Sequence, residues 1–178
     1  MEDKFLVWKF NNGDSSALSG IYEKYRDDLL RLGASVLNNM ADAEDVVQEV
    51  FIAFAKSAGD FKLTGSLRGF LSMCVVNRAR NYRLANKRKD SWAEQKSKLS
   101  LGNVESPEQL VINREQIERI CNLMSQLCND QREVISLRLY GKLKFREIAL
   151  LQKTPIRTVQ SRYRLGLEKL RILFSNEE

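Results

Sequence analysis

Apolar residues recur at steps of three and four along most of the chain, which is the period of an α-helix with one buried face. The first long stripe follows the turn residues 11–13, so it predicts a helix that begins near Asp14 and ends at Asn38 and Asn39. No stretch bounded by turns alternates apolar and polar residues with period two. The pattern therefore predicts an all-α fold. The expected buried stripe of this helix consists of Ala17, Leu18, Ile21, Tyr22, Tyr25, Leu29, Leu32 and Val36.

A second helix is predicted over residues 42–57, with Asp42 as its N-cap. Its inward face is expected to consist of Val46, Val47, Val50, Phe51 and Phe54. The opposite face carries Asp45, Gln48 and Glu49. From the residues alone, a solvated acidic face is the favoured interpretation. A metal site is disfavoured because these carboxylates lack a second cluster that would complete a coordination shell.

A third helix is predicted to follow a loop at residues 59–65, with Ser66 as its cap, and to run to about Asn86. Its expected apolar stripe is Leu67, Phe70, Leu71, Cys74, Val75 and Tyr82. Its C-terminal half is basic, with Arg78, Arg80, Arg83, Lys87, Arg88 and Lys89 before the first acid at Asp90. This charge exceeds what a helix dipole needs, so the segment predicts a nucleic-acid surface.

Helical periodicity is lost from residue 90 to about residue 105, which predicts a flexible linker between two helical domains. Structure is expected to resume at the capping box that begins with Ser106 and Pro107. A short helix should then be capped by Asn129 or Asp130 and end at Gly141.

Residues 144–174 predict a helix-turn-helix. The first helix covers about residues 144–152, and Thr154 and Pro155 are expected to cap and begin the second. The second helix has an apolar stripe at Ile156, Val159, Tyr163, Leu167, Leu170 and Phe174. The side chains expected to read base edges or bind phosphates are Arg157, Thr158, Gln160, Ser161, Arg162 and Arg164. An ordinary solvated face is the alternative, but that face has no acid between residues 155 and 167.

Composition supports a polyanionic partner. The 178 residues carry 29 Lys and Arg against 23 Asp and Glu, a formal net charge of +6. No apolar run is long enough for a membrane span, and the N-terminal segment does not resemble a signal peptide, so a cytoplasmic location near the nucleoid is expected. The chain has no histidine, which makes a zinc site improbable, and its three cysteines are expected to be reduced thiols. Cys121 and Cys128 lie seven residues apart and are expected in the core.

Two sets of short segments carry a resemblance to a known family. In the C-terminal half they are QREV at 131–134, LR at 137–138, EIA at 147–149, TVQSR at 158–162 and KLR at 169–171. In the N-terminal half they are DAEDVVQEVF at 42–51, SLRGFL at 66–71 and NRA at 77–79. In this order and spacing they resemble regions 4 and 2 of bacterial RNA polymerase sigma factors of the extracytoplasmic-function (ECF) group, in the sigma-70 family. The resemblance covers nearly the whole chain except the linker.

The resemblance implies roles for the first domain, residues 1–90. It would bind the clamp helices of the β′ subunit of core RNA polymerase through Asp45, Gln48 and Glu49, which replaces the solvated-face interpretation. It would also hold the unpaired bases of the −10 promoter element, where aromatic and basic side chains suit single-stranded DNA. The residues implied in that contact are Phe61, Lys62, Arg68, Asn77, Arg78, Arg80, Arg83 and Lys87.

For the second domain, residues 106–178, the resemblance implies that helix 156–166 enters the major groove of the −35 element. The rest of that domain would hold the tip of the β flap, and the linker at 91–105 would run toward the active-site channel of the polymerase. Family members are often held by an anti-sigma factor, so such a protein is a further candidate partner. No cofactor or metal is implied.

Three departures from the family's usual pattern bear on these roles. Met73 and Val76 stand where basic residues are frequent, which weakens the case for −10 contacts there. Lys153 stands where the turn usually has glycine, and a non-glycine residue in the left-handed region costs about 1–2 kcal/mol, so the sequence leaves this turn's conformation open. Leu150 and Gln152 invert the usual polar–apolar order at the end of their helix.

The sequence thus predicts a sigma factor that directs core polymerase to promoters and is not itself an enzyme. A stand-alone helix-turn-helix repressor is the first alternative, but it leaves the helix at 42–57 and the first basic helix unexplained. A nucleic-acid enzyme using the carboxylates at residues 42–49 is the second. The sequence argues against this hypothesis, because it has no histidine, no phosphate-binding glycine loop and no nucleophile–base pair.

Overall fold

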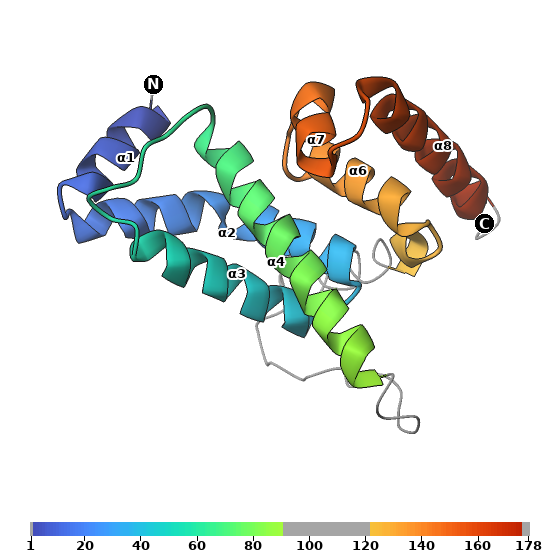
Figure 1. Ribbon diagram of the computed structural model, residues 1–178, viewed down its shortest axis with the longest axis horizontal. Coiled ribbons are helices and arrows are strands. Elements are labelled where there is room, and N and C mark those ends of the chain that lie inside the picture. The colour runs from blue at the N-terminus through green and yellow to red at the C-terminus, as the bar shows by residue number, and fades with distance from the viewer. Residues whose placement is uncertain (1, 91–121, 176–178) are drawn as a thin grey trace.

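The computed structural model describes residues 2–90 and 122–175, which form two groups of α-helices and contain no strand (Figure 1). The first group is α1 (Glu2–Asn11), α2 (Ser15–Leu37), α3 (Met40–Ala55) and α4 (Leu67–Asp90). The second is α6 (Asn129–Leu139), α7 (Phe145–Gln152) and α8 (Ile156–Ser175), preceded by a helical stretch at residues 122–125. The all-α, two-domain prediction is confirmed. The predicted linker at 91–105, the capping box at Ser106 and Cys121 lie outside the described residues.

Helix α1 was not predicted from the hydrophobic pattern, because only Val7 and Phe10 are buried along it. The ring of Phe10 stacks on that of Phe54 with centroids 4.5 Å apart, which joins α1 to α3. The hydroxyl of Tyr25 donates to the carboxylate of Asp3 over 2.7 Å and joins α1 to α2. Burial and this hydrogen bond raise the pKa of Tyr25 to about 12, so the hydroxyl stays a donor.

A sharp corner between α2 and α3 is made by two consecutive asparagines. Asn38 ends α2 in the left-handed conformation (φ 58°), as predicted, and Asn39 is the N-cap of α3. The side-chain oxygen of Asn39 accepts from the backbone N–H of Asp42 over 3.1 Å. The prediction of Asp42 as the cap was therefore wrong by three residues. Its carboxylate instead accepts a hydrogen bond from the hydroxyl of Tyr82 on α4 over 2.7 Å.

The first domain has two further helix starts and one helix end that can be compared with the sequence predictions. Ser66 caps α4, as predicted, by accepting from the backbone N–H of Gly69. Helix α2 begins at Ser15, close to the predicted start, and Asp14 caps it by accepting from the backbone N–H of Ser16. Helix α4 continues to Asp90, four residues beyond the expected end at Asn86.

At α6 the predicted caps were wrong. The N-cap is Cys128, which makes no side-chain capping bond, so neither Asn129 nor Asp130 has that role. Gly141 does follow this helix, but the left-handed residue beyond it is Lys142 (φ 52°). A Cβ at Gly141 would lie 2.7 Å from the carbonyl oxygen of Leu137, so close packing explains the glycine there.

The helix-turn-helix forms as predicted, and its turn keeps a left-handed residue. Lys153 has φ 51° and ψ 42° although it is not glycine. Thr154 was expected to cap α8, but its hydroxyl is buried and has no hydrogen-bond partner. Pro155 precedes the first residue of α8, and its carbonyl accepts from the backbone N–H groups of Thr158 and Val159.

Several residues predicted to be buried are exposed. Tyr22 and Phe70 lie at the surface, although the first contacts the ring of Phe51 and the second the rings of Phe54 and Phe61. Cys128 is exposed rather than in the core. Along α8, Val159 and Gly166 are buried, Tyr163 and Leu170 are partly buried, and the members of the predicted stripe that are exposed are Ile156, Leu167 and Phe174.

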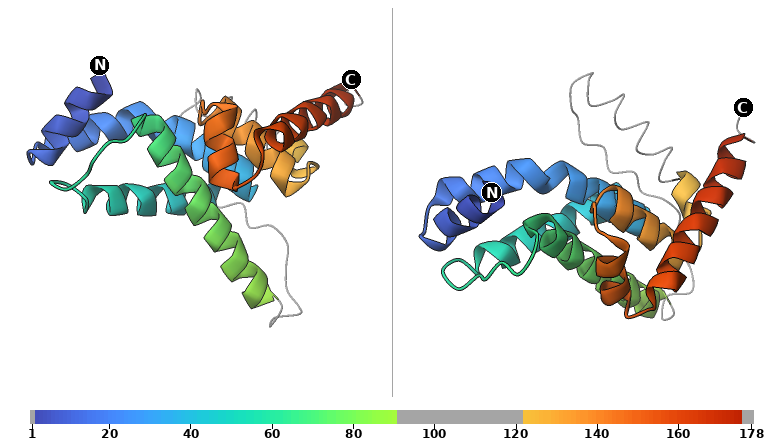
Figure 2. Two further views of the ribbon diagram at one scale, coloured as in Figure 1. Left: turned by 45° about the horizontal axis from the view of Figure 1, so that its top comes forward. Right: turned by 90° about the horizontal axis from the view of Figure 1, so that it is seen from above.

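The two groups of helices share one hydrophobic core rather than standing apart. Val134 and Leu137 of α6 belong to the same buried cluster as Leu71 and Val75 of α4. The hydroxyls of Ser35 on α2 and Ser136 on α6 lie 2.7 Å apart, and both are buried. Figure 2 shows α6 and α7 lying against α2 and α4, while the C-terminal end of α8 projects from the body of the molecule. The described structure is therefore a closed arrangement of the two domains.

Replacing Lys153 by glycine should stabilise the protein, because glycine adopts the left-handed conformation without the steric cost that lysine carries. We expect a gain of about 1 kcal/mol in the free energy of unfolding, or about 2–4 °C in melting temperature. The control is Lys56→Gly, at a residue in the right-handed region (φ −67°), which should lose stability. Calorimetry on both variants checks this, and a loss of stability in Lys153→Gly would contradict the argument.

Candidate polymerase and nucleic-acid interfaces

The acidic face of α3 is exposed along its middle. Asp45, Gln48 and Glu49 all lie at the surface, while Val46, Val47 and Val50 between them are buried in the core. Glu49 forms an ion pair with Arg78 of α4, and about half of each side chain is exposed. Such an exposed pair contributes little to stability, so the carboxylate remains free to exchange partners. The face is a rigid helical surface of negative charge, suited to contact with another protein.

The side chains predicted to contact the −10 element do not form one surface. Arg68 forms an ion pair with Asp28 of α2, Arg78 pairs with α3, and Arg80 pairs with Glu133 of α6. Three arginines of one helix thus point toward three different neighbours. Lys62, Asn77 and Arg78 are exposed, Phe61, Arg68, Arg80 and Arg83 are partly buried, and the side chain of Lys87 lies outside the described residues.

Phe61 belongs to a cluster of aromatic rings. Its centroid lies 5.0 Å from that of Phe54 and 4.8 Å from that of Phe70, and its carbonyl accepts a hydrogen bond from the side chain of Asn11 over 2.8 Å. The loop before α4 is therefore tied to α1 and α3. Phe61 as a whole is only partly buried, so the loop carries an aromatic residue near the surface on a base fixed by these contacts. Val76, one of the positions that depart from the family pattern, is fully buried and cannot meet DNA here, whereas Met73 is exposed.

The predicted −35 residues lie on the open side of α8. Arg157, Gln160 and Arg164 are exposed, and Thr158, Ser161 and Arg162 are partly buried. A hollow between α8 and the start of α6 is lined on the α6 side by Cys128, Asp130 and Gln131. Asp130 forms an ion pair with Arg162 across it. The sequence of α8 has no acid between residues 156 and 167, but folding brings Asp130 of α6 to the edge of the recognition face.

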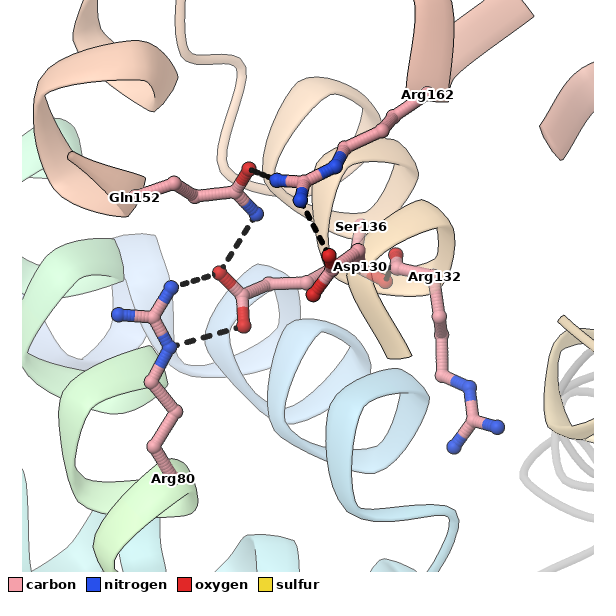
Figure 3. Close-up of polar contacts among 7 residues, drawn as sticks. Arg80, Asp130, Arg132, Ser136, Gln152 and Arg162 are labelled. Carbon is pink, nitrogen blue, oxygen red and sulfur yellow. Dashed lines mark hydrogen bonds and ion pairs between the residues drawn. The ribbon is translucent and has the colours of Figure 1, made fainter. Parts of the chain in front are cut away.

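A buried carboxylate links the two domains. The Nε of Arg80 donates to Glu133 over 3.0 Å, and its Nη2 contacts the second carboxylate oxygen. The amide of Gln152 donates to the same carboxylate over 2.9 Å, and its oxygen accepts from Arg162 over 3.1 Å. Figure 3 shows the resulting chain of contacts from Arg80 through Gln152 to Arg162 and Asp130. One predicted −10 cation and one predicted −35 cation therefore belong to a single network.

Arg132 has a role that sequence reasoning missed. It is buried, and its guanidinium donates to the carbonyl oxygens of Met124, Ser125 and Leu127 over 2.8–3.2 Å. These carbonyls lie at the end of the preceding helical stretch, where backbone oxygens lack partners in the helix. The QREV segment was visible as part of the family pattern, but its arginine holds the turn before α6 rather than a ligand.

Comparison with known proteins identifies the family. The models for sigma-70 region 2 and sigma-70 region 4 match residues 21–89 and 117–170. The chain belongs to the sigma-70 family, in its ECF group. It is 28% identical over 169 residues to the RNA polymerase sigma-H factor of Pseudomonas aeruginosa, covering 90% of this chain and 88% of that protein. It is 27% identical over 170 residues to the ECF RNA polymerase sigma-E factor of Escherichia coli K12, covering 91% and 88%.

Two solved structures share the fold of this chain. CnrH, in complex with the cytosolic domain of CnrY, has a TM-score of 0.70 and 20% identity, covering 99% of both chains. The sigma factor RpoE of Bartonella quintana, in complex with the anti-sigma factor NepR, has a TM-score of 0.63 and 19% identity, covering 89% of this chain and 99% of that one. The function of the chain is that of a sigma factor, which binds RNA polymerase for promoter recognition. The repressor alternative is not favoured.

Other chemistry is not indicated in the part of the chain that the structure describes. Within residues 2–90 and 122–175, no group of three or more Asp, Glu or Cys side chains is placed to hold a metal ion. No helix in the same two ranges has both the length and the hydrophobicity to cross a bilayer. Sigma factors as a family are generally not enzymes.

Proposed function

We propose that this sigma factor binds the β′ clamp helices of core RNA polymerase through the acidic face of α3 and recognises a two-part promoter through α4 and α8. The observation that carries the proposal is the exposure of both surfaces on one chain. The charged face of α3 and the basic face of α8 are each set on a helix whose other side is held in the core. The protein acts as a specificity subunit, without catalysis of its own, and works at the nucleoid.

The polymerase contact is assigned to Asp45, Gln48 and Glu49 because they form the exposed face of a well-packed helix. A rigid helix loses little entropy on docking, and negative charge is complementary to a basic partner surface. The free face of the C-terminal domain would hold the β flap. An anti-sigma factor is a second protein partner, supported by the two solved structures of similar fold, each a complex of two proteins.

The −10 contact is assigned to the aromatic loop and the basic helix after it. Phe61 is a partly buried aromatic residue of a kind that stacks on unpaired bases, and Lys62 beside it is exposed. Along α4, Asn77 and Arg78 are open to solvent, whereas Arg68 and Arg80 would first have to leave their carboxylate partners. Arg83 and Lys87 extend the same basic helix toward its end.

The −35 contact is assigned to the first three turns of α8. Val159 is buried and fixes the rotation of the helix about its axis. Gln160 and Arg157 are exposed on adjoining turns near the N-terminal end, which is the end that enters a major groove first. Arg164 is exposed one turn later and Arg162 lies at the edge of the helix, where phosphates pass.

Reversing charge on α3 should weaken polymerase binding without unfolding the helix. We expect Asp45→Lys with Glu49→Lys to lower affinity for core polymerase by about ten-fold or more, because like charges then face each other at the interface. Asp45→Lys alone, which leaves the Glu49–Arg78 pair intact, should account for a measurable part of the loss. Titration of labelled sigma with core polymerase measures this. The matched control is Glu23→Lys on α2, also exposed, and equal affinity in all variants would rule out α3 as the anchor.

Substitutions in α8 should divide into two kinds. Gln160→Ala and Arg157→Ala should change which −35 sequences are used, at about 1–3 kcal/mol each, because these side chains are placed to meet base edges. Arg162→Ala and Arg164→Ala should weaken all promoters alike and lower the salt slope by about one unit each. Holoenzymes carrying each variant, transcribing a randomised −35 library, give the comparison. If the first pair leaves the preferred sequence unchanged, base reading lies with Thr158, Ser161 and Arg162 instead.

The free chain should bind duplex promoter DNA poorly. Each domain offers one short basic helix. In the closed arrangement Arg80 of α4 and Arg162 of α8 are joined through Glu133 and Gln152, which is too close for contact with two separate promoter elements. Core polymerase would hold both at that spacing and so raise their effective concentration. Fluorescence anisotropy with promoter duplexes checks this with and without core. Tight sequence-specific binding by the isolated monomer would favour the repressor alternative.

A further inference from the structure

Glu133 is an acid buried between the two domains. Its side chain is only 11% exposed, and its carboxylate accepts from Arg80 of the other domain through two nitrogens and from Gln152 through one. A buried carboxylate is costly unless it is paired and hydrogen-bonded. Among the described residues, Arg80 is the one cation that forms an ion pair with this carboxylate, so neutralising the charge of Glu133 depends on the position of α4.

The same carboxylate reaches the recognition helix. Gln152 donates to Glu133 and accepts from Arg162, which also forms an ion pair with Asp130 (Figure 3). One acid therefore orders a cation of α4 directly and a cation of α8 through one amide. Both cations belong to the surfaces assigned to DNA.

Elsewhere in this interface, small residues allow the backbones to come close. The hydroxyls of Ser35 and Ser136 meet at 2.7 Å, and a Cβ on Gly69 would lie 3.1 Å from a methyl group of Leu143. Around them the core is apolar and continuous between the domains. An apolar contact of this kind holds the domains together but does not fix one relative position of them. The Arg80–Glu133 pair differs, because its two parallel hydrogen bonds form in one relative position of the domains and leave an unpaired, mostly buried carboxylate if Arg80 alone is removed.

The closed arrangement leaves the polymerase face open. Asp45, Gln48 and Glu49 are exposed in it, whereas Arg80 and Arg162 are held by carboxylates. Polymerase can therefore dock on α3 before the domains separate, and DNA contacts by Arg80 become possible only after its pair with Glu133 is broken.

We propose that Glu133 is a latch that keeps the free chain closed by pairing with Arg80 and, through Gln152, restraining Arg162. Separation of the domains breaks the pair and frees Arg80 for the DNA surface of α4, whereas Arg162 keeps Gln152 and Asp130 of its own domain as partners. The consequence for DNA rests on the proposed function. The latch itself is a property of the free chain and can be tested without polymerase or promoter.

The test uses buried thiols as reporters of domain separation. Cys74, Cys121 and Cys128 are replaced by alanine, and one cysteine is introduced as Ser35→Cys or Ser136→Cys, at interface positions 1% and 0% exposed. Its rate of alkylation measures how often the interface opens. A third reporter, Val159→Cys, is buried inside the C-terminal domain and measures unfolding of that domain instead.

We expect Glu133→Gln to raise the alkylation rates of both interface reporters by about ten-fold, as loss of a buried charge pair should. Arg80→Gln should do the same from the other domain, so the result does not depend on whether the first variant folds well. Glu168→Gln, the same change at an exposed acid of α8, should leave the rates unchanged. The rate at Val159→Cys should not change in any variant.

Unchanged rates at Ser35→Cys and Ser136→Cys in both latch variants would overturn the proposal. So would a rise at all three reporters in both variants, because it would mean unfolding rather than separation. Adding core polymerase to reporter proteins that keep Glu133 and Arg80 should raise the alkylation rates at Ser35→Cys and Ser136→Cys. If core has no effect while the free-chain variants behave as expected, the latch stands and the proposed function fails.

Discussion

The buried pair between Arg80 and Glu133 is the interaction on which the arrangement of this sigma factor depends. The apolar core on either side of it would be satisfied by many relative positions of the two domains, since hydrophobic contact is not directional. A bidentate arginine–carboxylate contact is directional and demands one geometry. Gln152 and Arg162 extend that geometry to the recognition helix, so the position of α4 and the state of α8 are not independent.

In the closed chain, some of the residues assigned to binding are exposed to solvent, and others are paired with carboxylates of neighbouring helices. The acidic face of α3 and the outer residues Arg157, Gln160 and Arg164 are at the surface. The residues held by partners are arginines directed at carboxylates of neighbouring helices, Asp28 and Glu133 among them. A cation that already has a buried acid as partner gains less from a phosphate than a free one does. The same arginines can therefore serve first in folding and later in DNA binding, but not in both at once.

Most of the fold was accessible from the sequence because its helices have strong local signals. The valines and phenylalanines of α3 and the cap at Ser66 follow from residues within one or two helical turns. Where prediction failed, the deciding contact was distant or the local signals competed. Helix α1 is held by Phe54 and Tyr25 rather than by its own pattern. Asn39 rather than Asp42 is the N-cap of α3. Both residues have a side-chain oxygen that can cap a helix, so the local sequence did not decide between them.

The candidate sites were predictable to a lesser extent. The exposed face of α3 and the outer side of α8 follow from helical periodicity once the buried stripe is known. The partners of Arg80 and Arg162 do not, because Glu133 is 53 residues from Arg80 in the chain and Asp130 lies on a different helix from Arg162. The local sequence does not distinguish an arginine that is free to bind DNA from one that pairs with an acid across a domain interface.

The central claim is that this chain gives core RNA polymerase its promoter specificity. The most direct measurement is transcription of a pool of templates with randomised upstream sequence by purified core polymerase, with and without the protein. The account predicts transcripts that depend on the protein and share two short sequence elements at a fixed spacing. Identical transcripts from core polymerase alone, or repression of existing transcripts without new ones, would contradict it.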